Sequence, residues 1–124
     1  LYRQSGLLGL SGLSNDMRTL EAAKTPQADD AIAYFVFRVR RELGAMAAAL
    51  GGIDALVFTG GIGEHSTRVR AEICDDTDWM GITIDPERNQ SGAGVISADS
   101  GKVRVLVVPT NEELVIARAA RALV

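Results

Sequence analysis

Hydrophobic residues recur every three or four positions along one long stretch of the chain, a spacing that is typical of an amphipathic helix. The recurring residues are Ile32, Phe35, Val36, Val39, Leu43, Met46 and Leu50. Pro26 precedes the stretch, and Gly51 and Gly52 follow it at the place where glycine commonly ends a helix. The pattern therefore predicts one helix over residues 27–50.

Two short apolar runs show no alternation of polar and apolar residues, which is typical of strands buried on both faces of a parallel sheet. These runs span residues 55–58 and 103–108, and helices are predicted after them over about 64–76 and 110–123. Shorter elements are predicted as well: a helix over 17–23, a loop over 6–14, a helical turn over 86–90 and strands near 82–84 and 95–96. This order of elements predicts an α/β fold with parallel strands flanked by helices.

Only two strands of the predicted sheet are convincing, and strands that are apolar on both faces need neighbours. We therefore expect the sheet to be incomplete in this chain and further strands to come from a longer protein. The first residues, Leu1-Tyr2-Arg3-Gln4, include neither a starting methionine nor the apolar core of a signal peptide, which agrees with that expectation.

The composition is that of one globular domain: 124 residues, of which 47% are hydrophobic and 23% are charged. Thirteen Lys and Arg against sixteen Asp and Glu leave a net charge of −3, which argues against a nucleic-acid partner. The apolar runs are too short to cross a membrane, so no membrane association is expected. Cys74 is the single cysteine and can form no internal disulfide, which favours a reducing, cytoplasmic location.

The segment Thr59-Gly60-Gly61-Ile62-Gly63-Glu64-His65 places three glycines between a predicted buried strand and a predicted helix. Glycines let the backbone approach a ligand closely, and the start of a helix presents free N–H groups to it. Ligands of parallel sheets bind at this edge, beyond the carboxyl ends of the strands. The dinucleotide pattern G-x-G-x-x-G is not met, because Ser66 stands at its last position. A ligand site and a tight turn that merely needs glycine both stay open.

The second predicted strand is followed by Pro109-Thr110-Asn111-Glu112-Glu113, which contains a capping box from Thr110 to Glu113. Capping explains Glu113 without any function, whereas Glu112 is not needed for the box. A carboxylate at this edge of the sheet could bind Mg²⁺ beside a phosphate. From the residues alone, capping is the favoured interpretation.

Another polar cluster is S-N-D-M-R at residues 14–18. An aspartate that caps a helix and an arginine that is a solvated surface charge would explain Asp16 and Arg18. The functional alternative is that Arg18 reaches a phosphate or stacks on a base. His65 is the only histidine, so a histidine-based triad or metal cluster within this chain is not expected.

Three motifs, in this order along the chain, resemble the C-terminal part of the acetate kinase family. They are G-L-L-G-L-S-G with S-N-D-M-R at residues 6–18, F-T-G-G-I-G-E at 58–64 and V-P-T-N-E-E-L-V-I-A at 108–117. The resemblance extends over nearly the whole chain, and the last two motifs are far more specific than a single glycine turn. It implies that the α/β fold is part of a ribonuclease-H-like domain of the actin-like ATPase type.

By this resemblance, residues 1–124 are part of a C-terminal nucleotide-binding domain, without its upstream strands and without the N-terminal domain. The implied activity is the reversible, Mg²⁺-dependent transfer of the γ-phosphoryl group of ATP to acetate, which yields ADP and acetyl phosphate. The implied partners are ATP, a short-chain carboxylate such as acetate, and a second copy of the full-length protein in a homodimer.

The resemblance also implies site residues. The nucleotide contacts are Asp16, Met17 and Arg18 in one segment and Gly61, Ile62, Gly63, Glu64 and His65 in another, and the Mg²⁺ ligand is Glu112. Glu112 is thereby reassigned from cap to metal site, while Glu113 stays structural. Family members often carry Asn where this chain has His65 and Ser where it has Asn15, and both changes keep a polar side chain.

The family's catalytic residues lie upstream and have no counterpart in this sequence. Because phosphoryl transfer needs charged groups from all sides of a cleft, we expect the chain by itself to be inactive, and also only marginally folded. Two alternatives stay open. One is a propionate or butyrate kinase of the same family, whose acyl pocket lies outside this chain. The other is a non-catalytic nucleotide-binding module.

Overall fold

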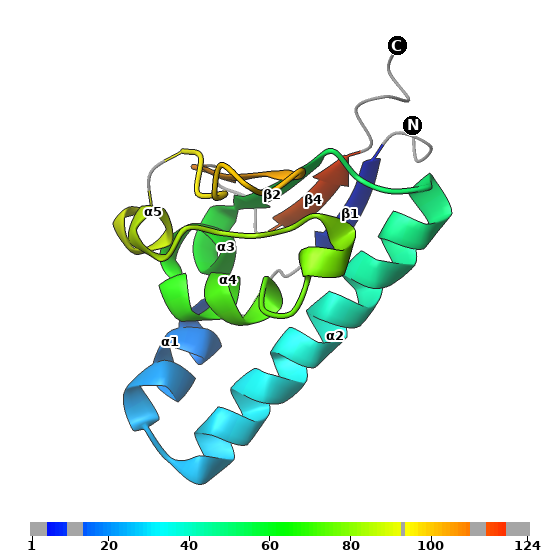
Figure 1. Ribbon diagram of the computed structural model, residues 1–124. Helices are drawn as coiled ribbons and strands as arrows, with labels where there is room; N and C mark the ends of the chain where they lie inside the picture. The colour runs from blue at the N-terminus through cyan, green and yellow to red at the C-terminus, as the bar shows by residue number, and fades with distance from the viewer. Residues whose placement is uncertain (1–4, 10–13, 93, 110–113, 119–124) are drawn as a thin grey trace.

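The computed structural model describes residues 5–9, 14–92, 94–109 and 114–118. Within these residues, four strands form one mixed sheet in the order β1-β4-β2-β3 (Figure 1). The strands are β1 (Ser5–Gly9), β2 (Ala55–Thr59), β3 (Arg104–Val108) and β4 (Leu114–Arg118). Strands β2 and β3 run parallel, whereas β4 runs antiparallel to both β1 and β2.

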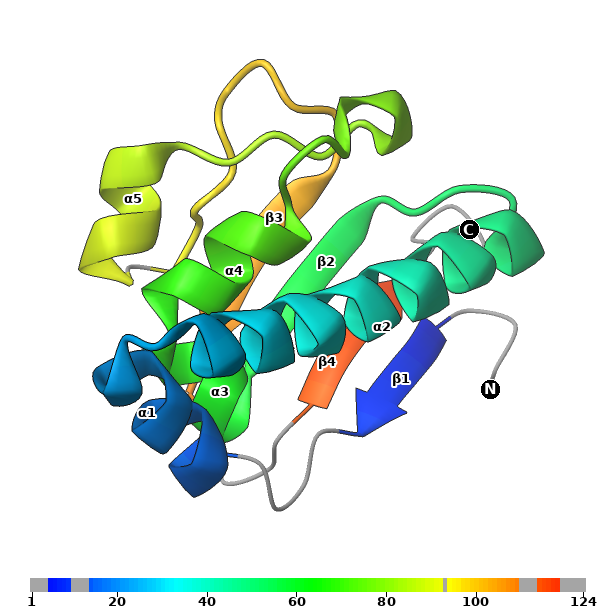
Figure 2. The same cartoon turned by 90° about the horizontal axis from the view of Figure 1, so that it is seen from below.

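Helices α1 to α4 lie on one side of this sheet, and α2 runs diagonally across it (Figure 2). Helix α2 (Pro26–Leu50) contacts β1 and β4, and α3 (Gly60–His65) contacts β2, β3 and β4. Helix α1 (Ser14–Ala23) packs on both α2 and α3. Helix α4 (Thr67–Ile73) follows α3 and packs on α2 and on α5 (Pro86–Ser91).

The helix predicted over residues 27–50 is confirmed as α2. The hydroxyl of Thr25 caps its start by accepting a hydrogen bond from the Ala28 N–H at 3.1 Å. Gly51 ends it with a left-handed backbone at φ 75°. The buried face consists of Ala28, Ile32, Val36, Val39, Leu43 and Ala47. Most of this face is the predicted apolar stripe, which packs on the sheet and on α4.

Cys74 follows α4, belongs to the apolar core and is 6% exposed. Burial raises the pKa of its thiol to about 12, although Arg70 and Arg40 act in the opposite direction. Because the thiolate is the reactive form, we expect iodoacetamide at pH 8 to leave Cys74 unmodified in the folded protein and to alkylate it readily in urea. Mass spectrometry would measure this, and equal rates in the two states would contradict the buried thiol.

The same pKa shift predicts that alkaline solution destabilises the fold. An unfolded cysteine loses its proton near pH 8.5, whereas the folded one keeps it up to about 12. The folded state therefore binds more protons than the unfolded state in this window, and the free energy of unfolding falls as the pH rises through it. A Cys74→Ala variant should lack this contribution.

One predicted helix is wrong in the structure. The sequence predicts a helix over 110–123, but Leu114–Arg118 form strand β4 between β1 and β2. Val115 and Ile116 are β-branched, a side-chain type that favours strands, and two neighbouring strands supply partners for the backbone. The capping box at 110–113 lies outside the described residues.

Two other predictions are corrected in part. The loop expected over 6–14 contains strand β1, which pairs with β4. The helix expected over 64–76 begins already at Gly60 and is divided at Ser66, whose backbone is extended at φ −96° and ψ 94°. The strands expected near 82–84 and 95–96 are isolated bridges of Ile84 with Ser97 and of Val95 with Leu106.

The predicted fold class is confirmed: an α/β fold in which a parallel strand pair is flanked by helices. The neighbours of β2 differ from the expectation, because this chain supplies both of them, β3 and β4. Because the sequence predicts a helix over 110–123, it does not identify β4 as a neighbour of β2.

Candidate functional site

The carboxyl ends of the two parallel strands meet at one edge of the sheet, as the sequence predicts. Thr59 is paired with Val108, and its hydroxyl donates a hydrogen bond to the Val108 carbonyl oxygen at 2.6 Å. Helix α3 starts directly after Thr59, and Gly60 makes this sharp change of direction with a left-handed backbone at φ 70°. Strand β3 ends at this edge with Val108, and Glu112, which follows it in the sequence, lies outside the described residues.

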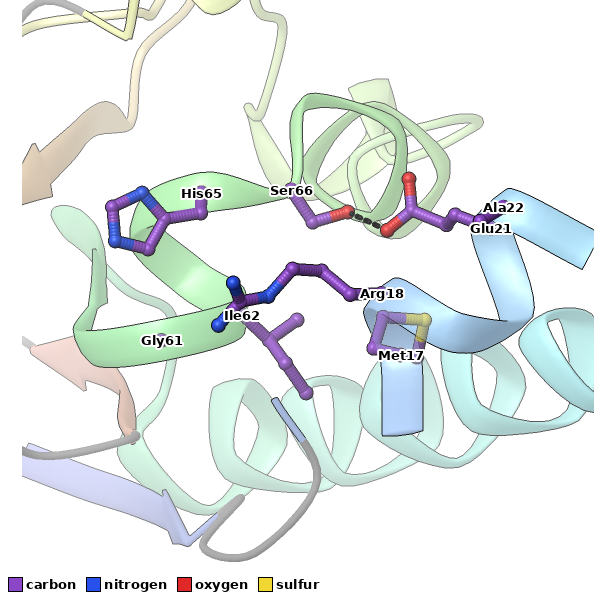
Figure 3. A pocket seen from close by; sticks show the side chains of 8 residues that line it. All are labelled: Met17, Arg18, Glu21, Ala22, Gly61, Ile62, His65 and Ser66. Atoms are coloured by element: carbon purple, nitrogen blue, oxygen red, sulfur yellow. Dashed lines mark hydrogen bonds between the residues drawn. The ribbon is translucent and has the colours of Figure 1, made fainter. Parts of the chain in front are cut away.

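A pocket of about 390 Å³ lies between helices α1 and α3 (Figure 3). Its lining consists of Met17, Arg18, Glu21, Ala22, Gly61, Ile62, His65 and Ser66. Two segments that lie far apart in the sequence, residues 17–22 and 61–66, thus form opposite walls of one pocket. These are the same two segments that the sequence singles out.

Five of the eight predicted nucleotide residues line this pocket: Met17, Arg18, Gly61, Ile62 and His65. Figure 3 shows the Arg18 side chain extending from α1 toward α3. Met17, near the start of α1, is buried, and Ile62 is buried on the opposite wall.

The other three predicted residues are not among the lining residues. They are Gly63 and Glu64 on α3, and Asp16, whose side chain is not described. The carbonyl oxygens of Gly63 and Glu64 accept hydrogen bonds from the Arg70 guanidinium at 3.0 and 2.8 Å. The Glu64 carboxylate lies 3.7 Å from His65 Nε2. The backbone of Asp16 belongs to α1, and its side chain lies outside the described part of the chain.

Glu21 and Ser66 also line the pocket, although the sequence motifs do not predict them. The Ser66 hydroxyl donates a hydrogen bond to Glu21 Oε2 at 2.8 Å, which ties α1 to the α3–α4 junction (Figure 3). Ser66 also caps α4 by accepting from the Val69 N–H at 3.1 Å. Helical spacing could have identified Glu21, because it follows Met17 and Arg18 by four and three residues and shares their face.

The chemistry of the pocket suits a ligand with both apolar and polar parts. Met17, Ile62 and the backbone of Gly61 offer flat apolar contact, while Arg18, Glu21 and His65 offer charge and hydrogen bonds. A guanidinium group is also a good partner for a phosphate or for the face of a base. Within the described residues, no group of three or more His, Cys, Asp or Glu side chains could hold a metal ion. None of the described helices is long and apolar enough to span a bilayer.

The structure is an α/β domain with a pocket beyond the carboxyl end of the central strand β2. The family model described as the Acetokinase family matches residues 1–118. The chain therefore belongs to the acetokinase family.

Individual relatives agree with this assignment. The acetate kinase of Rhodopseudomonas palustris strain TIE-1 is 58% identical over 120 residues, which cover 95% of this chain and 30% of that protein. The crystal structure of acetate kinase from Porphyromonas gingivalis superposes with a TM-score of 0.70 at 38% identity, over 78% of this chain and 25% of that one. A propionate kinase from Francisella tularensis subsp. tularensis SCHU S4 superposes with a TM-score of 0.69 at 31% identity, over 81% and 26%. The chain thus spans about 30% of the length of the curated relatives it matches.

Proposed function

We propose that this chain supplies the nucleotide-binding wall of an acetate kinase, an enzyme that transfers the γ-phosphoryl group of ATP reversibly to acetate. The observation that carries the proposal is the pocket between α1 and α3, in which both predicted nucleotide segments meet. In domain terms, residues 1–124 are then part of the C-terminal nucleotide-binding domain. We include in the proposal the homodimeric assembly that the family resemblance implies and the cytoplasmic location that the single cysteine favours.

In this proposal the adenosine part of ATP lies against α3. Gly61 and Ile62 contact the base and sugar, with Gly63, Glu64 and His65 completing the segment. Asp16, Met17 and Arg18 contact the nucleotide from α1. The guanidinium of Arg18 stabilises negative charge or stacks on the base, and both interactions favour a bound nucleotide over water.

Magnesium enters the proposal through Glu112. A carboxylate oxygen is the type of ligand that Mg²⁺ prefers, and a Mg²⁺ ion carried by nucleotide phosphates needs only one or two protein carboxylates. A carboxylate at position 112 therefore fits the ion, and β3, which precedes Glu112 in the sequence, ends at the edge that bears α3. When bound, Mg²⁺ would neutralise phosphate charge and orient the phosphates.

The alternative within the family is a kinase that acts on propionate or butyrate. The structural similarity to a propionate kinase supports keeping this alternative. A second alternative, a nucleotide-binding module without catalysis, would use the same pocket. The acetate kinase proposal and these two alternatives share the same nucleotide contacts. They differ in the activity of the rest of the protein.

The proposal is tested by acyl phosphate formation from ATP and Mg²⁺ by the longest reading frame that contains this sequence. Acetate, propionate and butyrate are compared, and the 124-residue chain serves as a control. We expect activity with acetate preferred, and none from the chain by itself. Preference for a longer acid would select the first alternative, and no activity with any acid would select the binding module.

Arg18→Ala in the same protein should weaken nucleotide binding. A hydrogen bond to a charged group contributes about 1.5–3 kcal/mol, so we expect the KM for ATP to rise by about ten- to a hundredfold. The KM for acetate should change little, because the acyl site lies elsewhere. Arg38→Ala is the matched control, since Arg38 stands on α2, contacts Tyr34 and does not line the pocket. If the two substitutions changed the KM for ATP equally, the proposal that Arg18 contacts the nucleotide would be wrong.

A further inference from the structure

Arg70 on α4 is a buried charged residue that the proposed nucleotide contacts do not use. It is 1% exposed. Its guanidinium donates to the carbonyl oxygens of Gly63 and Glu64, as given above, and to the Thr67 hydroxyl at 3.3 Å. It also donates to the side-chain oxygen of Asn89 at 2.7 Å and to the Asn89 carbonyl oxygen at 2.9 Å. All five acceptors are neutral.

Such a residue is costly unless its charge is well solvated by the protein. Burying a guanidinium without a carboxylate forfeits the attraction of an ion pair, and an apolar residue of similar volume could fill the same space. Burial also lowers the pKa of Arg70 from its usual value. The arginine therefore has a role that an apolar residue could not fill, and its hydrogen bonds show which groups it serves.

Two of those groups are among the last four carbonyl oxygens of α3, the helix that forms one wall of the pocket. This helix has six residues, three of them glycines, and glycine disfavours the helical state. The last carbonyl groups of a helix have no partner within it, and a positive charge is favourable at this end. Arg70 provides both the hydrogen-bond donors and the charge.

The other end of the guanidinium is held by α5. Asn89 is buried, accepts from Arg70 Nε, and donates through its side-chain nitrogen to the Thr67 carbonyl oxygen at 3.1 Å. Because the side-chain oxygen of Asn89 accepts one hydrogen bond and its side-chain nitrogen donates the other, the orientation of the amide group is fixed. Through it, Arg70 connects α3 to α4 and α5, so the placement of Gly61 and Ile62 depends on contacts made behind the pocket.

We infer that Arg70, oriented by Asn89, is a positioning residue that holds α3 in the geometry with which it receives the nucleotide. It does not touch the pocket itself, since it lines none of it. This inference rests on the proposed nucleotide role of the pocket. Its first test, however, needs no nucleotide, so its failure and the failure of the proposed function can be told apart.

The first test is amide hydrogen exchange of the longest reading frame without nucleotide. Arg70→Lys keeps a positive charge but loses the planar fork that reaches both α3 and α5. We expect exchange over residues 60–65 to become about tenfold faster, while exchange in β2 stays unchanged. Arg68→Lys is the matched control: Arg68 lies on the same helix, but it is half-exposed and pairs with Glu72 and Asp29. An increase spread evenly over the protein, or no increase beyond that of the control, would overturn the inference.

The second test separates positioning from a general loss of folded protein. If Arg70 positions α3, Arg70→Lys raises the KM for ATP by about tenfold or more, with little change in the KM for acetate. A merely structural role would lower the amount of active enzyme and leave both KM values unchanged, and that result would overturn the inference. Asn89→Ala, which keeps the Arg70 contacts to α3, should shift both readouts in the same direction by less. If the wild-type protein binds no ATP, the proposed function fails, and hydrogen exchange still decides whether Arg70 holds α3.

Discussion

Replacing Phe58 by alanine is expected to lower the free energy of unfolding by about 3–5 kcal/mol, the range found when buried aromatic residues are truncated. Phe58 lies on the central strand β2, is 1% exposed, and belongs to the core cluster beneath the helices. Its neighbours come from both the sheet and the helices, so the cavity cannot collapse by the shift of a single side chain. Urea unfolding of the longest reading frame that contains this sequence, as wild type and as variant, measures the difference.

The chain offers a matched control for this substitution. Phe37 lies on α2, is 57% exposed, and has the Arg41 guanidinium 5.9 Å from its ring centroid. Phe37→Ala removes the same atoms, so we expect it to cost about 1 kcal/mol or less, mainly through the lost ring contact. If Phe58→Ala lowers the free energy of unfolding no more than Phe37→Ala does, Phe58 is not a core residue and the structure is wrong at this position.

Glu112→Ala is expected to have the largest effect on activity, a fall in kcat of about a hundredfold or more with an increased requirement for Mg²⁺. The reason is electrostatic: phosphoryl transfer depends on groups that are already in place to neutralise phosphate charge, and losing one of them costs a factor of this order. The measurement is acetyl phosphate formation at several Mg²⁺ concentrations, with the longest reading frame that contains this sequence.

The neighbouring carboxylate is the control for Glu112. Glu113→Ala removes the same groups one position further along, and the family resemblance assigns no metal contact to Glu113. We expect kcat and the Mg²⁺ requirement to stay near the wild-type values, with any loss appearing in the stability of the fold. Parallel losses in the two variants, explained by less folded protein, would return Glu112 to a structural role.

Local pattern was sufficient to predict some elements of the fold. The apolar spacing from Ile32 to Leu50, with Pro26 before it and Gly51 after it, predicts α2 within one residue. The unbroken apolar run at 55–58 predicts β2 in the same way. In both cases the spacing of apolar residues and the residues at the ends of the segment agree with the state adopted, so the local sequence is sufficient.

For residues 114–118, the local pattern predicts the wrong element. The sequence of this segment suits a helix preceded by a capping box, yet the segment lies as a strand between β1 and β2. The partners of a strand come from distant parts of the chain, here residues 5–9 and 55–59, and no local pattern reveals that they are adjacent. Tertiary context overrides local propensity in such a place.

For the candidate site, the sequence by itself determined the two segments that meet, because the D-M-R and G-I-G-E-H motifs resemble a known family. The tertiary structure decided which of their side chains face the pocket, and it added the Glu21–Ser66 and Arg70–Asn89 hydrogen bonds. Those pairs join residues 45 and 19 positions apart. A buried polar group must find a partner wherever the fold brings one, so the pairing depends on packing and not on spacing along the chain.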